Sequence, residues 1–257
     1  MYLGRIVGVG RNCDGHPYIA TVASARSDDN RKRIYVPDDY RGEHMIRMDS
    51  TERKKLGWLK SIFDSSSFMD GKLSLPRKQW EDRMLIFYDA INADDASERA
   101  IASNGRQTDW IKQKLEGGAY DDIHLSMADG FLTAGGAESD GERTPRIAAI
   151  LNSKGDAILG IVTDRGMCMN AVELPSEGRM KYLTTYKGSP SDNREIVKIG
   201  LELPAGEVDI HGRNAQEIAG SLYRWMDPQF VICAAVARWN PDLTEWEIGK
   251  RNFHGQQ

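Results

Sequence analysis

Runs and alternations of apolar residues predict strand hairpins in the first and the middle parts of the chain. Residues 2–10 (YLGRIVGVG) and 17–24 (PYIATVAS) read as two strands, and the turn between them contains Asn, Asp and Gly. RIAAIL at 146–151 and AILGIV at 157–162, joined by NSKGD, form the clearest hairpin pattern in the chain. Antiparallel pairing of neighbouring strands is therefore expected.

Helical spacing of apolar residues appears in three further segments, at residues 110–116, 120–134 and 214–226. Thr108 or Asp109 is the expected N-cap of the first helix, which should stop at the two glycines that follow it. Further strands are predicted at residues 34–36, 84–91, 98–103, 180–186 and 229–239, and an edge strand at 244–253.

The order of these elements predicts the fold class. Hairpins come first, two helices follow, and then come more strands with one helix among them. Segregated runs of strands and helices favour an α+β fold with largely antiparallel sheets. Residues 40–83 differ from the rest of the chain in their pattern of apolar and polar residues, and they contain one helix-like segment, at 51–63. We interpret this stretch as an insertion or lid.

Composition and charge narrow the classes of function. The 257 residues carry a net charge of -4, which disfavours nucleic acid as a partner because phosphate binding needs a clustered basic excess. No run of about 18 apolar residues occurs, so no membrane span is expected. The three cysteines are widely spaced and odd in number, which indicates reduced thiols and a cytoplasmic location.

Common catalytic motifs are missing from the sequence. Gly8 and Gly10 follow a strand but lack the third glycine of a dinucleotide-binding turn, and no phosphate-binding P-loop motif occurs. The five histidines are scattered without metal-ligand spacing, so we expect no metal. Cys13 lies close to His16, but adjacent turn residues rarely form a nucleophilic pair, and a hairpin cysteine is the simpler interpretation.

Four motifs, taken in order, resemble the archaeal-type inosine monophosphate (IMP) cyclohydrolases. They are MYLGRIVGVGRN with SARSDDNR after it, IFYDAI, SNGRQTDWI, and ERTPRIAAILN followed by GIVTDRG. The resemblance covers roughly residues 1–36 and 84–190. The ordered set is more specific than any one of its motifs.

The resemblance implies a fold and a domain plan. The fold is the four-layer αββα sandwich of the N-terminal-nucleophile hydrolases, formed here as a single domain over residues 1–257. Those hydrolases use a Ser, Thr or Cys at the chain start as nucleophile. This chain begins Met1-Tyr2, so we expect the fold without a terminal nucleophile.

The family's reaction joins two groups of one substrate and needs no nucleophilic side chain. In the formamidoimidazole carboxamide ribotide, the carboxamide nitrogen attacks the formyl carbon, and loss of water leaves the hypoxanthine ring. The resemblance assigns three catalytic residues. Arg31 stabilises the formyl oxygen or the phosphate, Tyr88 donates a proton to the leaving hydroxyl or the oxyanion, and Glu138 accepts the amide proton.

Further residues are candidates for binding the purine ribonucleotide. Asn104 and Gly105 offer amide and backbone donors, Thr144 and Arg146 suit ribose or phosphate, and Arg5 and Arg26 suit phosphate. The resemblance implies no cofactor and a homo-oligomer. The sequence departs from the family at Asp28-Asp29, where an apolar pair is usual, so a different substrate stays open if these aspartates face the ligand.

Two alternatives remain beside the cyclohydrolase. One is an amidohydrolase acting on a related cyclic or acylated amine, which needs a nucleophile that the chain start does not supply. The other is a purine-nucleotide-binding protein without catalysis, which would keep the arginines and tolerate a change at Glu138.

Overall fold

Two antiparallel sheets form the centre of the computed structural model, which describes residues 3–24, 33–37, 42–47, 88–116, 122–138, 143–186 and 203–252. Residues 33–37, 42–47, 88, 89 and 252 are described by their backbone alone. The first sheet has six strands in the order β11-β10-β1-β2-β12-β13, and the second has seven in the order β3-β4-β5-β6-β7-β8-β9.

The six-stranded sheet consists of β1 (Arg5–Arg11), β2 (Pro17–Ser24), β10 (Arg179–Thr184), β11 (Gly206–Asp209), β12 (Val231–Asn240) and β13 (Glu245–Asn252). The seven-stranded sheet consists of β3 (Arg33–Pro37), β4 (Gly42–Arg47), β5 (Tyr88–Asp94), β6 (Arg99–Ser103), β7 (Arg146–Asn152), β8 (Ala157–Thr163) and β9 (Gly166–Val172). The helices are α3 (Gln107–Glu116), α4 (Ile123–Thr133) and α5 (Ala215–Trp225).

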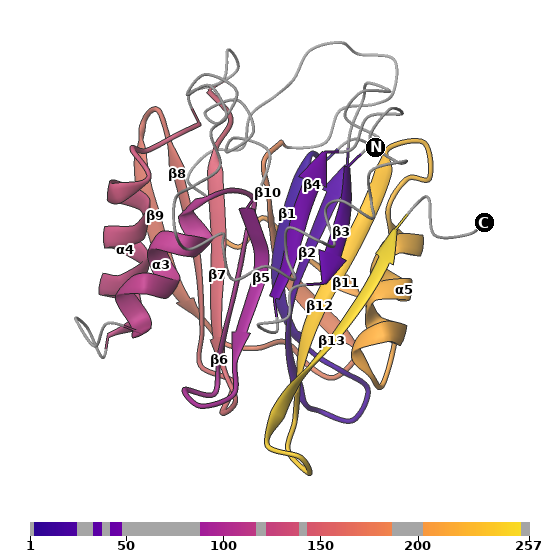
Figure 1. Ribbon diagram of the computed structural model, residues 1–257. Helices are drawn as coiled ribbons and strands as arrows, with labels where there is room; N and C mark the ends of the chain where they lie inside the picture. Colours follow the sequence, from indigo (N-terminus) through magenta and orange to yellow (C-terminus); the bar gives the residue numbers. More distant parts are fainter. Residues whose placement is uncertain are drawn as a thin grey trace, which may run out of the picture.

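The two sheets pack face to face, and helices cover their outer faces (Figure 1). Helices α3 and α4 lie on the seven-stranded sheet, where they contact β5 to β8, and α5 lies on β2, β12 and β13 of the other sheet. The described residues therefore form an α+β arrangement with antiparallel sheets, as the element order predicts, and the two sheets lie between layers of helices.

Burial on both faces explains the continuous apolar runs in the central strands. Along β7, Ile147 and Ala149 point into the core between the sheets, whereas Ala148 and Ile150 point to the core under α3 and α4. Successive side chains of a strand point to opposite faces, so a strand covered on both faces is apolar at every position. The run RIAAIL follows from this position in the middle layer.

Most predicted strands and helices are present, with differences at the edges. Three strands were not predicted, namely β4, β9 and β11. Strand β4 lies at the start of the stretch interpreted as an insertion and pairs with β3 and β5, so those residues belong to the sheet. Residues 48–83 lie outside the described residues.

The predicted N-cap of the first helix is wrong. Helix α3 begins at Gln107, so Thr108 and Asp109 lie inside its first turn. The Thr108 hydroxyl and N–H both donate to the carbonyl of Gly105, at 3.1 and 3.2 Å. The turn at Gly105 therefore continues directly into the helix, and the hydroxyl of Thr108 supports that turn instead of capping the helix.

Strand registers place several chain segments at one end of the sandwich. Arg5 begins β1, Ser103 ends β6, and Arg146 begins β7, two residues before the partner of Ser103 in the ladder. We call this end, which is uppermost in Figure 1, the Arg5 end. The hairpin turn between β1 and β2 lies at the opposite end.

Candidate active site

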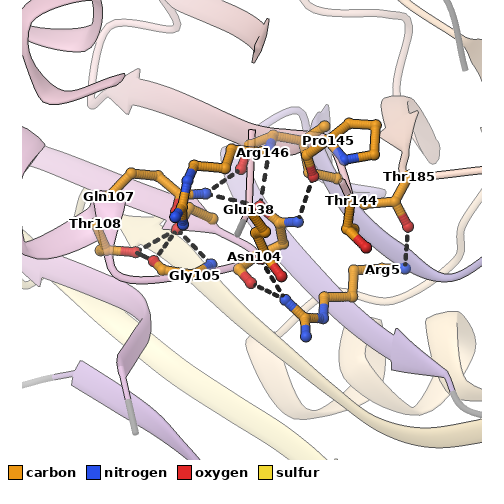
Figure 2. A network of polar contacts seen from close by, with 12 residues as sticks. Arg5, Asn104, Gly105, Gln107, Thr108, Glu138, Thr144, Pro145, Arg146 and Thr185 are labelled. Carbon is orange, nitrogen blue, oxygen red and sulfur yellow. Dashed lines mark hydrogen bonds and ion pairs between the residues drawn. The ribbon is translucent and has the colours of Figure 1, made fainter. Parts of the chain in front are cut away.

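An ion pair joins the two sheets' layers at the Arg5 end. The Arg5 Nη1 atom lies 2.9 Å from Glu138 Oε1, and each side chain is 17% exposed. The same Nη1 also donates to the carbonyl of Asn104, as Figure 2 shows. The carboxylate is therefore held in one place by a cation, yet part of its surface remains accessible.

The end of α4 determines where Glu138 lies. Gly135, with φ of +83°, follows the C-cap Ala134, and its N–H donates to the carbonyl of Leu132 at 3.0 Å. The N–H of Gly136 donates to the carbonyl of Phe131 at 3.3 Å. This pair of bonds is the Schellman motif, and glycine suits its left-handed position. The chain then turns toward β7.

A short backbone contact fixes Glu138 beside the start of β7. Its N–H donates to the carbonyl of Thr144 at 2.9 Å, and Thr144 is two residues before β7. The Thr144 hydroxyl lies 3.3 Å from the Tyr186 hydroxyl, and Thr185, next to Tyr186, accepts from the Arg5 N–H at 3.0 Å. The end of β10 therefore supports both partners of the ion pair.

Two buried amide side chains lie beneath the ion pair, Asn104 and Gln107, which are 1% and 0% exposed. The Asn104 amide group donates to the carbonyl of Pro145 at 2.9 Å, and its oxygen accepts from the N–H of Ile147 at 2.8 Å. Gln107 donates to the Asn104 oxygen at 2.7 Å. Buried amides with these partners are costly to displace, so they form a rigid floor.

The second arginine of the cluster is Arg146, the first residue of β7. Its Nε atom donates to the carbonyl of Gly136 at 2.7 Å, and its Nη1 atom donates to Gln107 Oε1 at 3.2 Å. Arg5 and Arg146 thus bring two cations to the side of the cluster where Glu138 lies (Figure 2). Such an arrangement suits an anionic ligand and a proton acceptor together.

Gly105 lies where these polar groups converge. A Cβ atom at this position would lie 2.7 Å from Gln107 Oε1 and 3.2 Å from both Arg146 Nη1 and Glu138 Oε1. A side chain would therefore displace the groups that form the cluster. The Gly105 N–H donates to the Ser103 hydroxyl at 3.2 Å, so this backbone donor takes part in the turn.

The structure brings together six of the residues proposed from the sequence, which are Arg5, Asn104, Gly105, Glu138, Thr144 and Arg146. Arg26 and Arg31 lie outside the described residues. The described residues that flank their segment, Ser24 and Arg33, both lie at the Arg5 end. Ser24 bonds to Gly4, which is next to Arg5. Arg33, the first residue of β3, pairs with Arg47, the last residue of β4.

Tyr88 is described by its backbone alone. It is the first residue of β5 and pairs with Met45 of β4. Since β5 runs antiparallel to β6, the start of β5 lies at the end of the sheet where Ser103 ends β6. The backbone of Tyr88 therefore reaches the same end of the sandwich as Glu138.

Sequence reasoning missed Gln107. A glutamine in the first turn of a helix resembles ordinary polar surface, and only the packing of α3 against the start of β7 buries it. Its place in the motif SNGRQTDWI, two residues after Gly105, was the available signal.

Among the described ranges, no group of three or more His, Cys, Asp or Glu side chains is arranged to hold a metal ion. None of the helices α3, α4 and α5 is long and apolar enough to cross a membrane. Cys13 lies beyond the far end of β1 from Arg5, in the turn to β2.

Comparison with known proteins gives one consistent result. The model of the family described as IMP cyclohydrolase-like protein matches residues 67–242. An IMP cyclohydrolase of Methanocaldococcus jannaschii is 27% identical over 92% of this chain and 93% of its own length. One from Methanosphaera stadtmanae is 27% identical over 98% of this chain and 100% of its own length. One from Methanothrix thermoacetophila is 32% identical over 59% of this chain and 65% of its own length.

Proposed function

Since the chain belongs to the family of IMP cyclohydrolase-like proteins, we propose that it is an IMP cyclohydrolase. The reaction is the cyclodehydration of 5-formamidoimidazole-4-carboxamide ribotide to IMP and water, the step that closes the purine ring. The observation that carries the proposal within this structure is the carboxylate of Glu138, held by Arg5 beside the second arginine, Arg146.

The chemistry defines what the site must supply. The carboxamide nitrogen bonds to the formyl carbon, and a tetrahedral adduct with a hydroxyl forms. The attacking nitrogen passes one of its two protons to the adduct's oxygen and keeps the other. The former formamido nitrogen then loses its proton and forms a double bond to the same carbon, while the C–O bond breaks and the hydroxyl, after gaining a proton, leaves as water. Orienting two substituents of one molecule lowers the barrier through proximity. The rest of the rate enhancement comes from stabilising the oxygen that gains charge and from moving protons.

The Glu138 carboxylate is suited to accept the amide proton of the substrate. This carboxylate is partly exposed and is held by Arg5, while the backbone N–H of Glu138 donates to the carbonyl of Thr144, so contacts from two different layers fix the residue. The sequence placed Arg5 among the phosphate-binding residues. Its contacts support a different proposal, in which Arg5 orients the carboxylate of Glu138 and Arg146 serves the ribose or phosphate.

Tyr88 and Arg31 complete the proposed catalytic set. We propose that Tyr88 donates the proton to the leaving hydroxyl, which its strand position at the Arg5 end supports. Arg31 stabilises the formyl oxygen or the phosphate, and Arg26 adds a further phosphate contact. Their segment connects Ser24 with Arg33, two residues at the same end.

We also propose the fold type, the domain plan, the location and the oligomeric state of the protein. The arrangement of two sheets between helices supports an N-terminal-nucleophile-hydrolase-like αββα sandwich. We further propose a single domain over residues 1–257 in which the part of residues 40–83 after β4 is an insertion or lid, a cytoplasmic location, and a homo-oligomer. Light scattering after gel filtration measures the last of these.

A direct assay tests the function. Purified protein is incubated with the formamido ribotide without added cofactor, and IMP formation is followed by ultraviolet absorbance while calorimetry measures IMP binding. IMP formation supports the cyclohydrolase. Tight IMP binding without turnover favours the binding protein, and hydrolysis of a related acylated amine favours the amidohydrolase. The absence of both turnover and IMP binding would contradict the proposal.

A further inference from the structure

The orientation of the Asn104 side chain is set by two backbone groups that each have a single hydrogen-bonding role. The N–H of Ile147 can only donate, and it lies 2.8 Å from Asn104 Oδ1. The carbonyl of Pro145 can only accept, and it lies 2.9 Å from Asn104 Nδ2. Exchanging the oxygen and nitrogen of the amide would break both bonds, so the oxygen of Asn104 must face Ile147.

This orientation determines that of Gln107 in turn. Asn104 Oδ1 and the carbonyl of Ile147 are both acceptors, and Gln107 Nε2 donates to them at 2.7 and 3.1 Å. The other end of the Gln107 amide is therefore the oxygen, and this oxygen faces Arg146 Nη1 at 3.2 Å. The start of β7 thus dictates, through two amides, that a neutral acceptor faces the guanidinium.

The two acceptors hold the Arg146 guanidinium from two sides. Its Nε donates to the carbonyl of Gly136, which follows α4, and its Nη1 donates to Gln107, which begins α3. Both acceptors are uncharged, so neither contact neutralises the guanidinium. Arg146 is thus oriented while these two contacts leave its charge intact.

We propose that Gln107 is a positioning residue for substrate binding, which acts by fixing the Arg146 guanidinium against the ribose or phosphate of the purine ribonucleotide. The inference rests on the proposed function and adds a residue to it. It also predicts that an amide is required at this position. A carboxylate would add a negative charge beside Arg146 and could not donate to Asn104 and Ile147, and an apolar side chain would remove one of the acceptors that hold Arg146.

A double-mutant cycle tests the coupling between the two residues. We compare the wild type, Gln107→Met, Arg146→Met and the double variant, and measure kcat and KM for the formamido ribotide. Gln107→Met should raise KM about tenfold with kcat nearly unchanged, because a uniform binding contact is lost. In the Arg146→Met background the same change should have no further effect on KM. Independent, multiplicative effects on KM would overturn the proposal.

The Gln107→Glu variant tests the chemistry of the contact. It has the shape of the wild-type side chain but places a carboxylate against Arg146, which competes with an anionic substrate. We expect KM to rise at least as much as in Gln107→Met. An unchanged KM would contradict a positioning role, since this variant preserves packing and alters only the hydrogen bonds and the charge.

Gln216 provides a matched control. It lies at the start of α5 and bonds through both ends of its amide to the backbone of Lys250, at 2.8 and 3.1 Å. Gln216→Met should leave KM unchanged, and an equal rise in KM would overturn the specific role of Gln107. A wild-type protein with neither turnover nor IMP binding contradicts the proposed function itself. Normal wild-type activity with an uncoupled cycle contradicts only the role of Gln107.

Discussion

Two arginine–glutamate pairs with the same distance lie at opposite ends of the sandwich. At one end, Arg5 and Glu138 are 2.9 Å apart. At the other, Arg238 and Glu247 are also 2.9 Å apart, and they face each other across the β12–β13 hairpin. The second pair joins residues nine positions apart in the chain, whereas the first joins residues 133 positions apart.

The surroundings of the two pairs differ more than the pairs themselves. Arg238 is held by Glu247 and by His16, at 3.0 Å, so it ties the turn between β1 and β2 to the neighbouring hairpin. Around Arg5 lie a second arginine, buried amides and a glycine that leaves room for them. Distance therefore does not distinguish a structural ion pair from a functional one, and the neighbouring groups do.

The largest expected effect comes from neutralising one carboxylate of each pair. Glu138→Gln should reduce kcat by about 10²-fold or more, because it removes the proposed proton acceptor. Glu247→Gln should leave kcat unchanged, since its pair serves the fold. Steady-state kinetics of both variants measures the contrast. Equal losses of activity would erase the distinction between the two ends.

A pair of tyrosine variants tests the same contrast without a change of charge. Tyr88→Phe should lower kcat about 10²-fold, because it removes the proposed proton donor. Tyr18, at the start of β2, is fully buried, and burial raises the pKa of its hydroxyl. Because Tyr18 pairs with Gly10, at the end of β1 far from Arg5, Tyr18→Phe should retain wild-type kcat. Wild-type turnover in Tyr88→Phe would exclude the tyrosine from the reaction.

A methyl group added at Gly105 tests the packing of the cluster. Gly105→Ala should reduce kcat/KM about tenfold, since the new Cβ would displace Gln107 and press on Arg146 and Glu138. In the control, Gly220→Ala, the Cβ meets only Arg224 Nη1, at 3.4 Å, and the helix should gain about 1 kcal/mol. Kinetics and thermal unfolding of both proteins give the comparison, and an active Gly105→Ala would show that the cluster tolerates displacement.

The smallest effect on activity is expected at Arg238. Arg238→Met should lower the free energy of unfolding by about 1–3 kcal/mol, because Glu247 and His16 lose a shared partner in a largely buried position. Activity per folded molecule should not change. Denaturant unfolding measures the first quantity. A lower kcat without loss of stability would assign a functional role to this end.

Local patterns predicted most of the fold. The β1–β2 and β7–β8 hairpins and helix α5 carry strong turn, cap and periodicity signals, and the structure confirms them. Strand β9, with the sequence GMCMNAV, was missed because it lies at a sheet edge and lacks a clear alternation of apolar and polar residues. Strand β11 has only four residues, too few for a period.

Local sequence patterns predicted less of the candidate site than of the fold. Glu138 was proposed from a family resemblance, and Arg5 and Asn104 were proposed from the donors that their side chains carry. No spacing along the chain could show that these side chains meet. Gln107 was missed because its burial depends on contacts with β7, forty positions away. The pairing of Arg5 with Glu138 changes its proposed role from phosphate binding to support of a carboxylate.

A crystal structure of the protein with IMP bound would show whether Glu138 and Arg146 contact the nucleotide. The attacking carboxamide nitrogen becomes N1 of the hypoxanthine ring, so the account predicts Glu138 within about 3 Å of N1 or its neighbour C2. It also predicts the ribose phosphate in contact with Arg146. IMP bound at the Arg238 end, or bound without any contact to Glu138, would contradict the account.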